Sequence, residues 1–88
     1  MKQIVTVTEV EGEGLEALLG TNALLFGLNY IYAGKLVGVN TSFAKLEDAM
    51  IVYETGPFTT PGYTIAQKLP SKHWYVQISA LESYGPGK

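Results

Sequence analysis

Two short stretches of this chain carry the side chains best suited to hold a flat, polar ligand. The first is Asn40-Thr41-Ser42-Phe43, in which small polar groups stand next to an aromatic ring. Such a combination can stack a single-stranded base and hydrogen-bond its edge. The second is Lys72-His73-Trp74-Tyr75, where a cation adjoins aromatic side chains and offers a stacking surface. Both stretches are compatible with contact to a nucleobase.

Each stretch also has a purely structural interpretation. Residues 40–43 have the composition of a tight hairpin turn, with Phe43 filling one end of a small β-fold. Residues 72–75 have the composition of an interface strand whose aromatic side chains pack against a neighbouring subunit. The residue types alone leave both interpretations open.

Patterns that would indicate catalysis or metal binding are missing from the sequence. Glu47 and Asp48 are adjacent, so on a strand they point to opposite faces and cannot work as a carboxylate pair. His73 is the only histidine, and the chain has no cysteine, so no metal-ligand spacing occurs. No glycine run matches a phosphate-binding loop. We therefore predict a protein that is not an enzyme and that uses no metal or cofactor.

The charge balance counts against a strong nucleic-acid binder. The net charge is −2, and all six positive side chains are lysines. Arginine is the residue best suited to bidentate phosphate contacts and to stacking on bases, and the chain has none. A nucleic-acid site in this chain would rely on aromatic stacking and on lysine charges.

Size and hydrophobicity predict one domain that associates with copies of itself. Eighty-eight residues suffice for one core, and there are no disulfides to stabilise it. The apolar fraction of 47% is high beside a charged fraction of 16%, so we expect part of the apolar surface to lie against other subunits. No stretch is apolar enough for a membrane span and none resembles a signal peptide, which predicts a soluble, cytoplasmic protein.

The patterns along the chain predict a short helix followed by five short strands. Residues 4–10 alternate as a strand or extended arm, and residues 11–20 have leucines at helical spacing, an acidic start and a closing glycine. We expect an arm and helix over residues 1–20, a β-barrel over 21–84 and a frayed tail over 85–88. The expected strands cover residues 22–28, 30–39, 44–54, 72–78 and 80–84. The intervening residues 55–71 hold three of the four prolines and are expected to form a long connection.

The order of residue types resembles the first motif of the Sm and Sm-like proteins. Leu24 and Phe26 match its apolar pair, and Tyr32 its aromatic position. Its bent-strand glycine, the following leucine and the closing element match Gly34, Leu36, Leu46, Asp48 and Ala49. Residues 76–81 resemble the second motif in its bacterial Hfq-like form, and the chain is also similar to an Sm-like group of marine cyanophages.

This resemblance implies a strongly bent, five-stranded SH3-like (Sm-like) barrel that closes into a homo-oligomeric ring of about five to seven subunits. In such rings the fourth strand pairs with the fifth strand of the next subunit. The loop after the bent strand holds a nucleobase in the family, but here it is one residue shorter, Asn40 replaces its aspartate, and its later asparagine is missing.

The resemblance and the residue types together give two sets of candidate residues. The expected nucleic-acid site comprises Asn40, Thr41, Ser42, Phe43, Lys45, Tyr75 and Gln77. The expected subunit interface comprises Lys72, His73, Trp74, Tyr75, Val76, Leu81 and Tyr84. The leading hypothesis is a ring that binds single-stranded RNA, or single-stranded DNA, in a processing or chaperone role. The alternative is a structural or protein-interaction ring of a phage, which the missing arginines and the negative charge favour.

Overall fold

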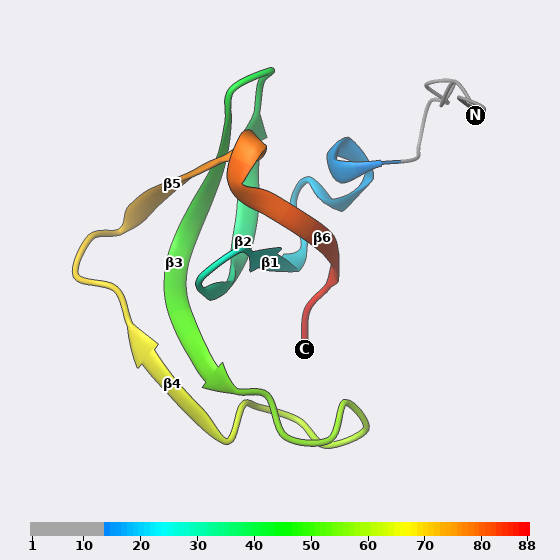
Figure 1. The fold of residues 1–88 in the computed structure, drawn as a ribbon, viewed down its shortest axis with the longest axis vertical. Coiled ribbons are helices and arrows are strands. Elements are labelled where there is room, and N and C mark those ends of the chain that lie inside the picture. Colours follow the sequence, from blue (N-terminus) through cyan, green and yellow to red (C-terminus); the bar gives the residue numbers. More distant parts are fainter. Residues whose placement is uncertain (1–13) are drawn as a thin grey trace, which may run out of the picture.

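A computed structural model describes residues 14–88, which form one antiparallel sheet with two single-turn 3-10 helices (Figure 1). The helices are η1 (Leu15–Leu18) and η2 (Ile78–Ala80). The six strands are β1 (Asn22–Gly27), β2 (Ile31–Val39), β3 (Phe43–Glu54), β4 (Ile65–Lys68), β5 (His73–Gln77) and β6 (Leu81–Pro86). Neither of these helical turns has the length or the apolar character to cross a membrane.

The predicted mainly β class is confirmed, but the sheet has six strands and is not closed. The strand order is β4-β3-β2-β1-β6, and β5 pairs with β3. Five strands lie close to their predicted positions, whereas β4 falls inside the segment predicted to be a long connection. A strand of four residues between proline-rich segments carries too short an alternation to be distinguished from extended loop.

The predicted helix over residues 11–20 is not formed as an α-helix within the described residues. Within residues 14–20 the helical part is η1, and it ends before Gly20, whose N–H donates to Leu36 O of β2 (2.7 Å). The Leu36 N–H returns a bond to Thr21 O (3.0 Å), so the chain already pairs with β2 directly after the helical turn. Gly20 has φ +84°, the conformation expected of the closing glycine. The strand or arm predicted for residues 4–10 lies outside the described residues.

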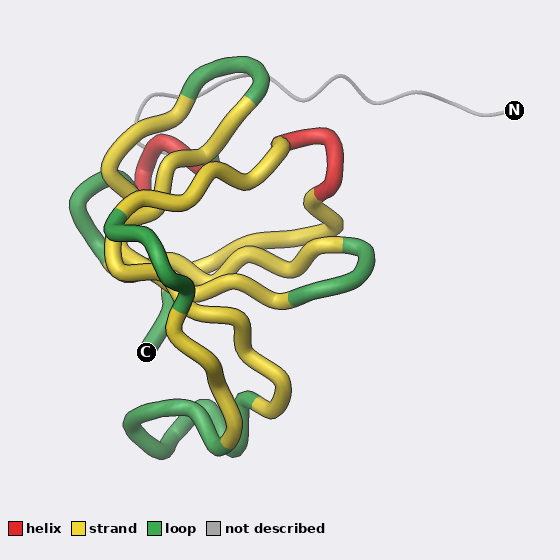
Figure 2. The backbone as a smooth tube through the Cα atoms, turned by 90° about the vertical axis from the view of Figure 1, so that its left-hand side faces the viewer, coloured by secondary structure: helices red, strands yellow, loops and turns green. Residues whose placement is uncertain are grey.

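Strand β3 is the central element, and it changes partner half-way along its length. Its first half, from Phe43 to Glu47, pairs with β5, and its second half, from Met50 to Glu54, pairs with β4. Figure 1 shows β5 and β4 following one another along the same side of β3, while Figure 2 shows how the sheet bends around its interior. Between the halves, the register against β2 shifts at a bulge that includes Gly34.

Hydrophobic side chains occupy both faces of this bent sheet. The larger cluster lies on the face shared by β1, β2, β3 and β5, and its fully buried large side chains are Leu25, Leu36 and Leu46. A smaller cluster, built on Leu24 and Val52, lies on the other face. Strand β1 therefore contributes consecutive buried residues, whereas β3 alternates between core and surface.

The change of partner in β3 occurs at Asp48, the only non-glycine residue with positive φ (+53°) among residues 14–88. The Asp48 N–H donates to Lys72 O (2.8 Å), and Ala49 O accepts from Leu69 N–H (2.9 Å). The residue after β4 and the residue before β5 are therefore both bonded to β3 at this bend. Aspartate tolerates the left-handed conformation better than most residues, but still at a cost.

We expect Asp48→Gly to leave the free energy of unfolding within about 0.5 kcal/mol of the unmodified value, because glycine adopts positive φ freely. Asp48→Val is expected to lower it by about 2 kcal/mol, because a β-branched side chain is strained in this conformation. Asp48 is exposed, so loss of packing does not complicate the comparison. Urea titrations followed by circular dichroism measure both effects, and equal stability of the two variants would contradict the left-handed bend.

The predicted frayed tail over residues 85–88 is wrong. Strand β6 continues to Pro86, and Gly87 N–H donates to Asn22 O (2.9 Å). The Lys88 side chain donates to three backbone carbonyls of the segment between β3 and β4. A composition of glycine, proline and lysine suggested disorder, but these residues gain their bonds from partners distant in sequence.

Candidate functional site

The exposed face of the β3–β5 pair gathers most of the predicted nucleic-acid residues. Phe43 lies opposite Gln77, and Lys45 lies opposite Tyr75. Residues directly opposite one another in an antiparallel pair point to the same face, so these four side chains share one surface. The intervening residues Ala44 and Val76 point to the core and are buried. Strand alternation thus places polar and aromatic side chains outside.

Two aromatic rings and one ammonium form the centre of this surface, which we call the Phe43–Tyr75 cluster (Phe43, Lys45, Tyr75 and Gln77). The ring centroids of Phe43 and Tyr75 are 6.4 Å apart at 84°, an edge-to-face contact. Lys45 Nζ lies 5.7 Å from the centroid of Tyr75, within range of a cation–π interaction. Phe43 is 41% exposed and Tyr75 57% exposed, so both rings keep accessible surface.

The turn that precedes Phe43 is held by Asn40. The Asn40 Oδ1 atom accepts the N–H groups of Ser42 and Phe43, each at 2.7 Å, and the Asn40 N–H donates to Phe43 O (3.0 Å). The side-chain oxygen predicted to read a base edge is therefore engaged within its own turn. Asn40 positions Phe43 at the start of β3, and Thr41 and Ser42 are exposed at the tip of the turn.

The second predicted stretch, residues 72–75, is divided between the two faces of β5. Trp74 is half-buried against the larger core cluster, whereas Tyr75 points outward. Lys72 Nζ and His73 Nε2 both lie near Glu47 Oε2, at 3.8 and 3.6 Å. These four residues therefore do not form a single stacking surface, because consecutive side chains of a strand alternate. Only Tyr75 joins the cluster.

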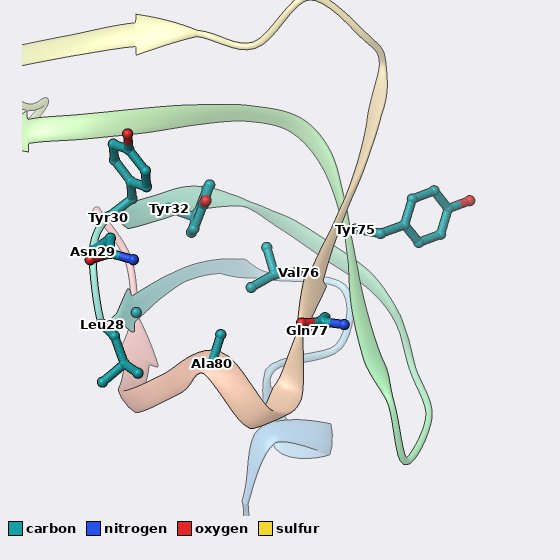
Figure 3. Close-up of a pocket in the computed structure, with 9 residues that line it drawn as sticks. Leu28, Asn29, Tyr30, Tyr32, Tyr75, Val76, Gln77 and Ala80 are labelled. Atoms are coloured by element: carbon teal, nitrogen blue, oxygen red, sulfur yellow. The ribbon is translucent and has the colours of Figure 1, made fainter.

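An open groove of about 240 Å³ lies on the other side of β5, and the sequence patterns did not indicate it. The β1–β2 turn at Leu28 to Tyr30 forms one wall, and Val76 and Ala80 form the other. In Figure 3, Val76 and Ala80 point toward the groove, whereas the ring of Tyr75 points away from it. Tyr75 and Gln77 of the Phe43–Tyr75 cluster also line the groove, so the groove and the cluster adjoin one another along β5.

Three strands have an edge without a partner strand among the described residues, namely β4, β5 and β6, and the edges of β5 and β6 are the ones predicted to join subunits. Ile78 N–H donates to Ser42 O and Asp48 N–H to Lys72 O, each at 2.8 Å, so even-numbered β5 residues bond to β3. By alternation, the backbone groups of His73, Tyr75 and Gln77 point away from β3. The bond from Gly87 N–H to Asn22 O sets the same alternation on β6, where the backbone of Tyr84 points away from β1. Within residues 14–88, no strand covers either edge.

The predicted interface residues divide between these two edges. Residues 72–76 lie on or beside β5, and Leu81 and Tyr84 lie on β6. Leu81 is half-buried and packs against the larger core cluster, whereas Tyr84 is exposed.

Comparisons with models of known protein families, with curated proteins and with solved structures gave no match. The fold and the two surfaces described above are therefore the basis for a functional proposal.

Proposed function

We propose that this chain is an Sm-like subunit that assembles into a homo-oligomeric ring and binds single-stranded nucleic acid, RNA in preference to DNA. The observation that carries the proposal is the Phe43–Tyr75 cluster. It combines two accessible aromatic faces with a lysine, on a surface rigidly held by paired strands. Aromatic faces stack any base, and a nearby cation favours the phosphate backbone.

The ring part of the proposal is supported by the free edges of β5 and β6. The Sm-like resemblance implies that the fourth predicted strand, here β5, pairs with the fifth predicted strand, here β6, of the next subunit. Both strands have outward-facing backbone groups, and an uncovered edge of this kind is a template for strand pairing. Closing this pairing around a ring would cover the β5 and β6 edges of every subunit without an open end. We propose that the bent sheet completes its barrel-like form in this assembly.

The test is fluorescence anisotropy of labelled oligo-U and oligo-A RNA and of matched single-stranded DNA. Titrations at about 50 and 200 mM salt separate phosphate-driven binding from stacking, because the former weakens steeply with salt. Binding at micromolar concentrations that falls with salt supports the proposal. No binding at tens of micromolar would contradict it.

We expect Phe43→Ala and Tyr75→Ala each to weaken RNA binding by about 5- to 150-fold, since stacking of one base contributes roughly 1 to 3 kcal/mol. Tyr53→Ala is the matched control. Tyr53 is another exposed tyrosine of β3 (55% exposed), but it lies in the half of the strand that pairs with β4. Equal losses in all three variants would show that binding does not depend on the cluster.

The second candidate function is a ring that holds proteins together and binds no nucleic acid. The net charge of −2 and the lack of arginine favour it, because the cluster offers only one lysine to a phosphate backbone. Both candidate functions assume the same ring, so only the anisotropy experiment distinguishes them. A ring that leaves every labelled oligonucleotide unbound supports this second function.

A further inference from the structure

The segment between β3 and β4 encloses the ammonium group of Lys88. The Lys88 Nζ donates to the backbone carbonyls of Thr55 (2.7 Å), Pro57 (2.9 Å) and Gly62 (2.7 Å). A lysine ammonium carries three N–H donors, so three converging carbonyls match it completely. We call this arrangement of residues 55–64 the carbonyl cradle.

Two aromatic rings complete the surroundings of the ammonium. Its nitrogen lies 5.1 Å from the ring centroid of Tyr63 and 5.6 Å from that of Phe58, which are cation–π distances. Among the described residues, no carboxylate lies within ion-pair distance of Lys88. The cradle therefore holds a cation by neutral dipoles and ring faces, and its three carbonyls require a group that donates three hydrogen bonds.

The loop has internal restraints that shape the cradle independently of the lysine. Gly56 has φ +71°, and a Cβ at this position would overlap the Thr64 Oγ1 atom. The Thr60 N–H donates to Pro57 O (3.1 Å), which closes a turn inside the loop. Tyr63 packs against the smaller core cluster. A loop held at these points keeps its carbonyls convergent at low entropic cost.

The backbone next to Lys88 is held without its ammonium. Gly87 N–H donates to Asn22 O (2.9 Å), and Lys88 N–H donates to the Tyr63 hydroxyl (3.1 Å). Removing the side chain beyond Cβ would therefore open the cradle while the peptide stays beside it.

We propose that the carbonyl cradle is a binding site for primary alkylammonium groups, the chemical class of a lysine side chain, and that Lys88 fills it from within the chain. The cradle and the tail belong to opposite ends of the strand order, so the bound lysine connects β4 to β6. An empty cradle accepts an alkylammonium ion from outside. This proposal is independent of nucleic-acid binding and involves none of the cluster residues.

The test uses the Lys88→Ala variant of the full chain, labelled with ¹⁵N, and n-propylammonium, which restores the atoms that the substitution removes. We expect saturable chemical-shift changes confined to the amides of residues 55–64, with half-saturation on the order of 10 mM for so small a ligand. The unmodified protein should respond at least about tenfold more weakly, because Lys88 already occupies the site. If the loop signals broaden in the variant, n-propylammonium should restore them.

Three controls keep the test decisive. 1-Propanol has the same chain length without charge, and tetramethylammonium has charge without N–H donors, so neither should produce the saturable response. Gly56→Val in the Lys88→Ala background distorts the cradle and should abolish it. An equal response to tetramethylammonium or propanol would overturn the proposal. So would the lack of any response, or of any recovery of broadened signals, with n-propylammonium.

Discussion

Leu46→Ala is expected to lower the free energy of unfolding by about 3 to 5 kcal/mol, the upper part of the range for a buried leucine. Leu46 is 0% exposed and lies in β3 between Leu36 of β2 and Trp74 of β5. It therefore packs where three strands meet, and the neighbouring backbone is fixed by pairing on both sides. A cavity at this point cannot collapse easily, so the loss of contacts is not recovered.

This loss is large relative to the whole fold. At roughly 0.05 to 0.15 kcal/mol per residue, an 88-residue domain has a stability of about 4 to 13 kcal/mol. Val37→Ala is the matched control, because Val37 follows Leu36 in β2 but is 37% exposed. Its cost should stay near 0.5 kcal/mol. Urea denaturation of both variants measures the difference, and similar midpoints would show that Leu46 does not occupy the core.

Tyr75→Pro is expected to reduce the mass of the proposed ring to that of a single subunit. The Tyr75 N–H faces away from β3, so proline leaves the β3–β5 pairing intact while it removes a donor from the free edge. Edge prolines block pairing with another chain for this reason. Sedimentation velocity or size-exclusion chromatography with light scattering reports the mass directly.

Tyr75→Ala is the control for the loss of the tyrosine side chain, since it keeps the backbone N–H at the edge of β5. It should remain assembled while losing affinity for RNA. Gln77→Pro is a second edge variant, and the φ of Gln77 (−67°) already equals that of proline, so it tests the edge without strain in the subunit. An unchanged mass for both proline variants, with circular dichroism showing a folded sheet, would rule out assembly through β5.

Sequence patterns predicted five of the six strands at close to their observed positions. They did not predict features that depend on which strands pair with one another. Residues 44–54 are predicted to form a strand because Met50 to Tyr53 are rich in β-forming residues and the segment follows a hairpin-sized turn, and β3 covers Phe43–Glu54. This pattern could not show that β3 would pair with two strands in turn, since that depends on the left-handed residue Asp48. Likewise, β4 has no buried residue, so no hydrophobic alternation marks it.

The candidate site was predicted in its residue types and only in part in its geometry. All four cluster residues were predicted as site residues. The β3–β5 register shows that they lie on one surface, because it places Phe43 opposite Gln77 and Lys45 opposite Tyr75. The role of Asn40 within its own turn follows from asparagine chemistry and could have been inferred from the turn composition. The cradle around Lys88 uses backbone carbonyls, which leave no signature in side-chain types.

The pairing of β1 with β6 has a consequence for synthesis on the ribosome. Strands β1, β2 and β3 are joined by short turns and can pair as soon as they emerge, but β6 is made after all of them. Until then β1, whose side chains are buried on both faces, lacks its second partner. A nascent chain therefore cannot yet offer β6 as a docking edge to another copy. In the proposed ring, this delays the joining of that edge until translation has passed Pro86, so that prematurely terminated chains cannot close a ring.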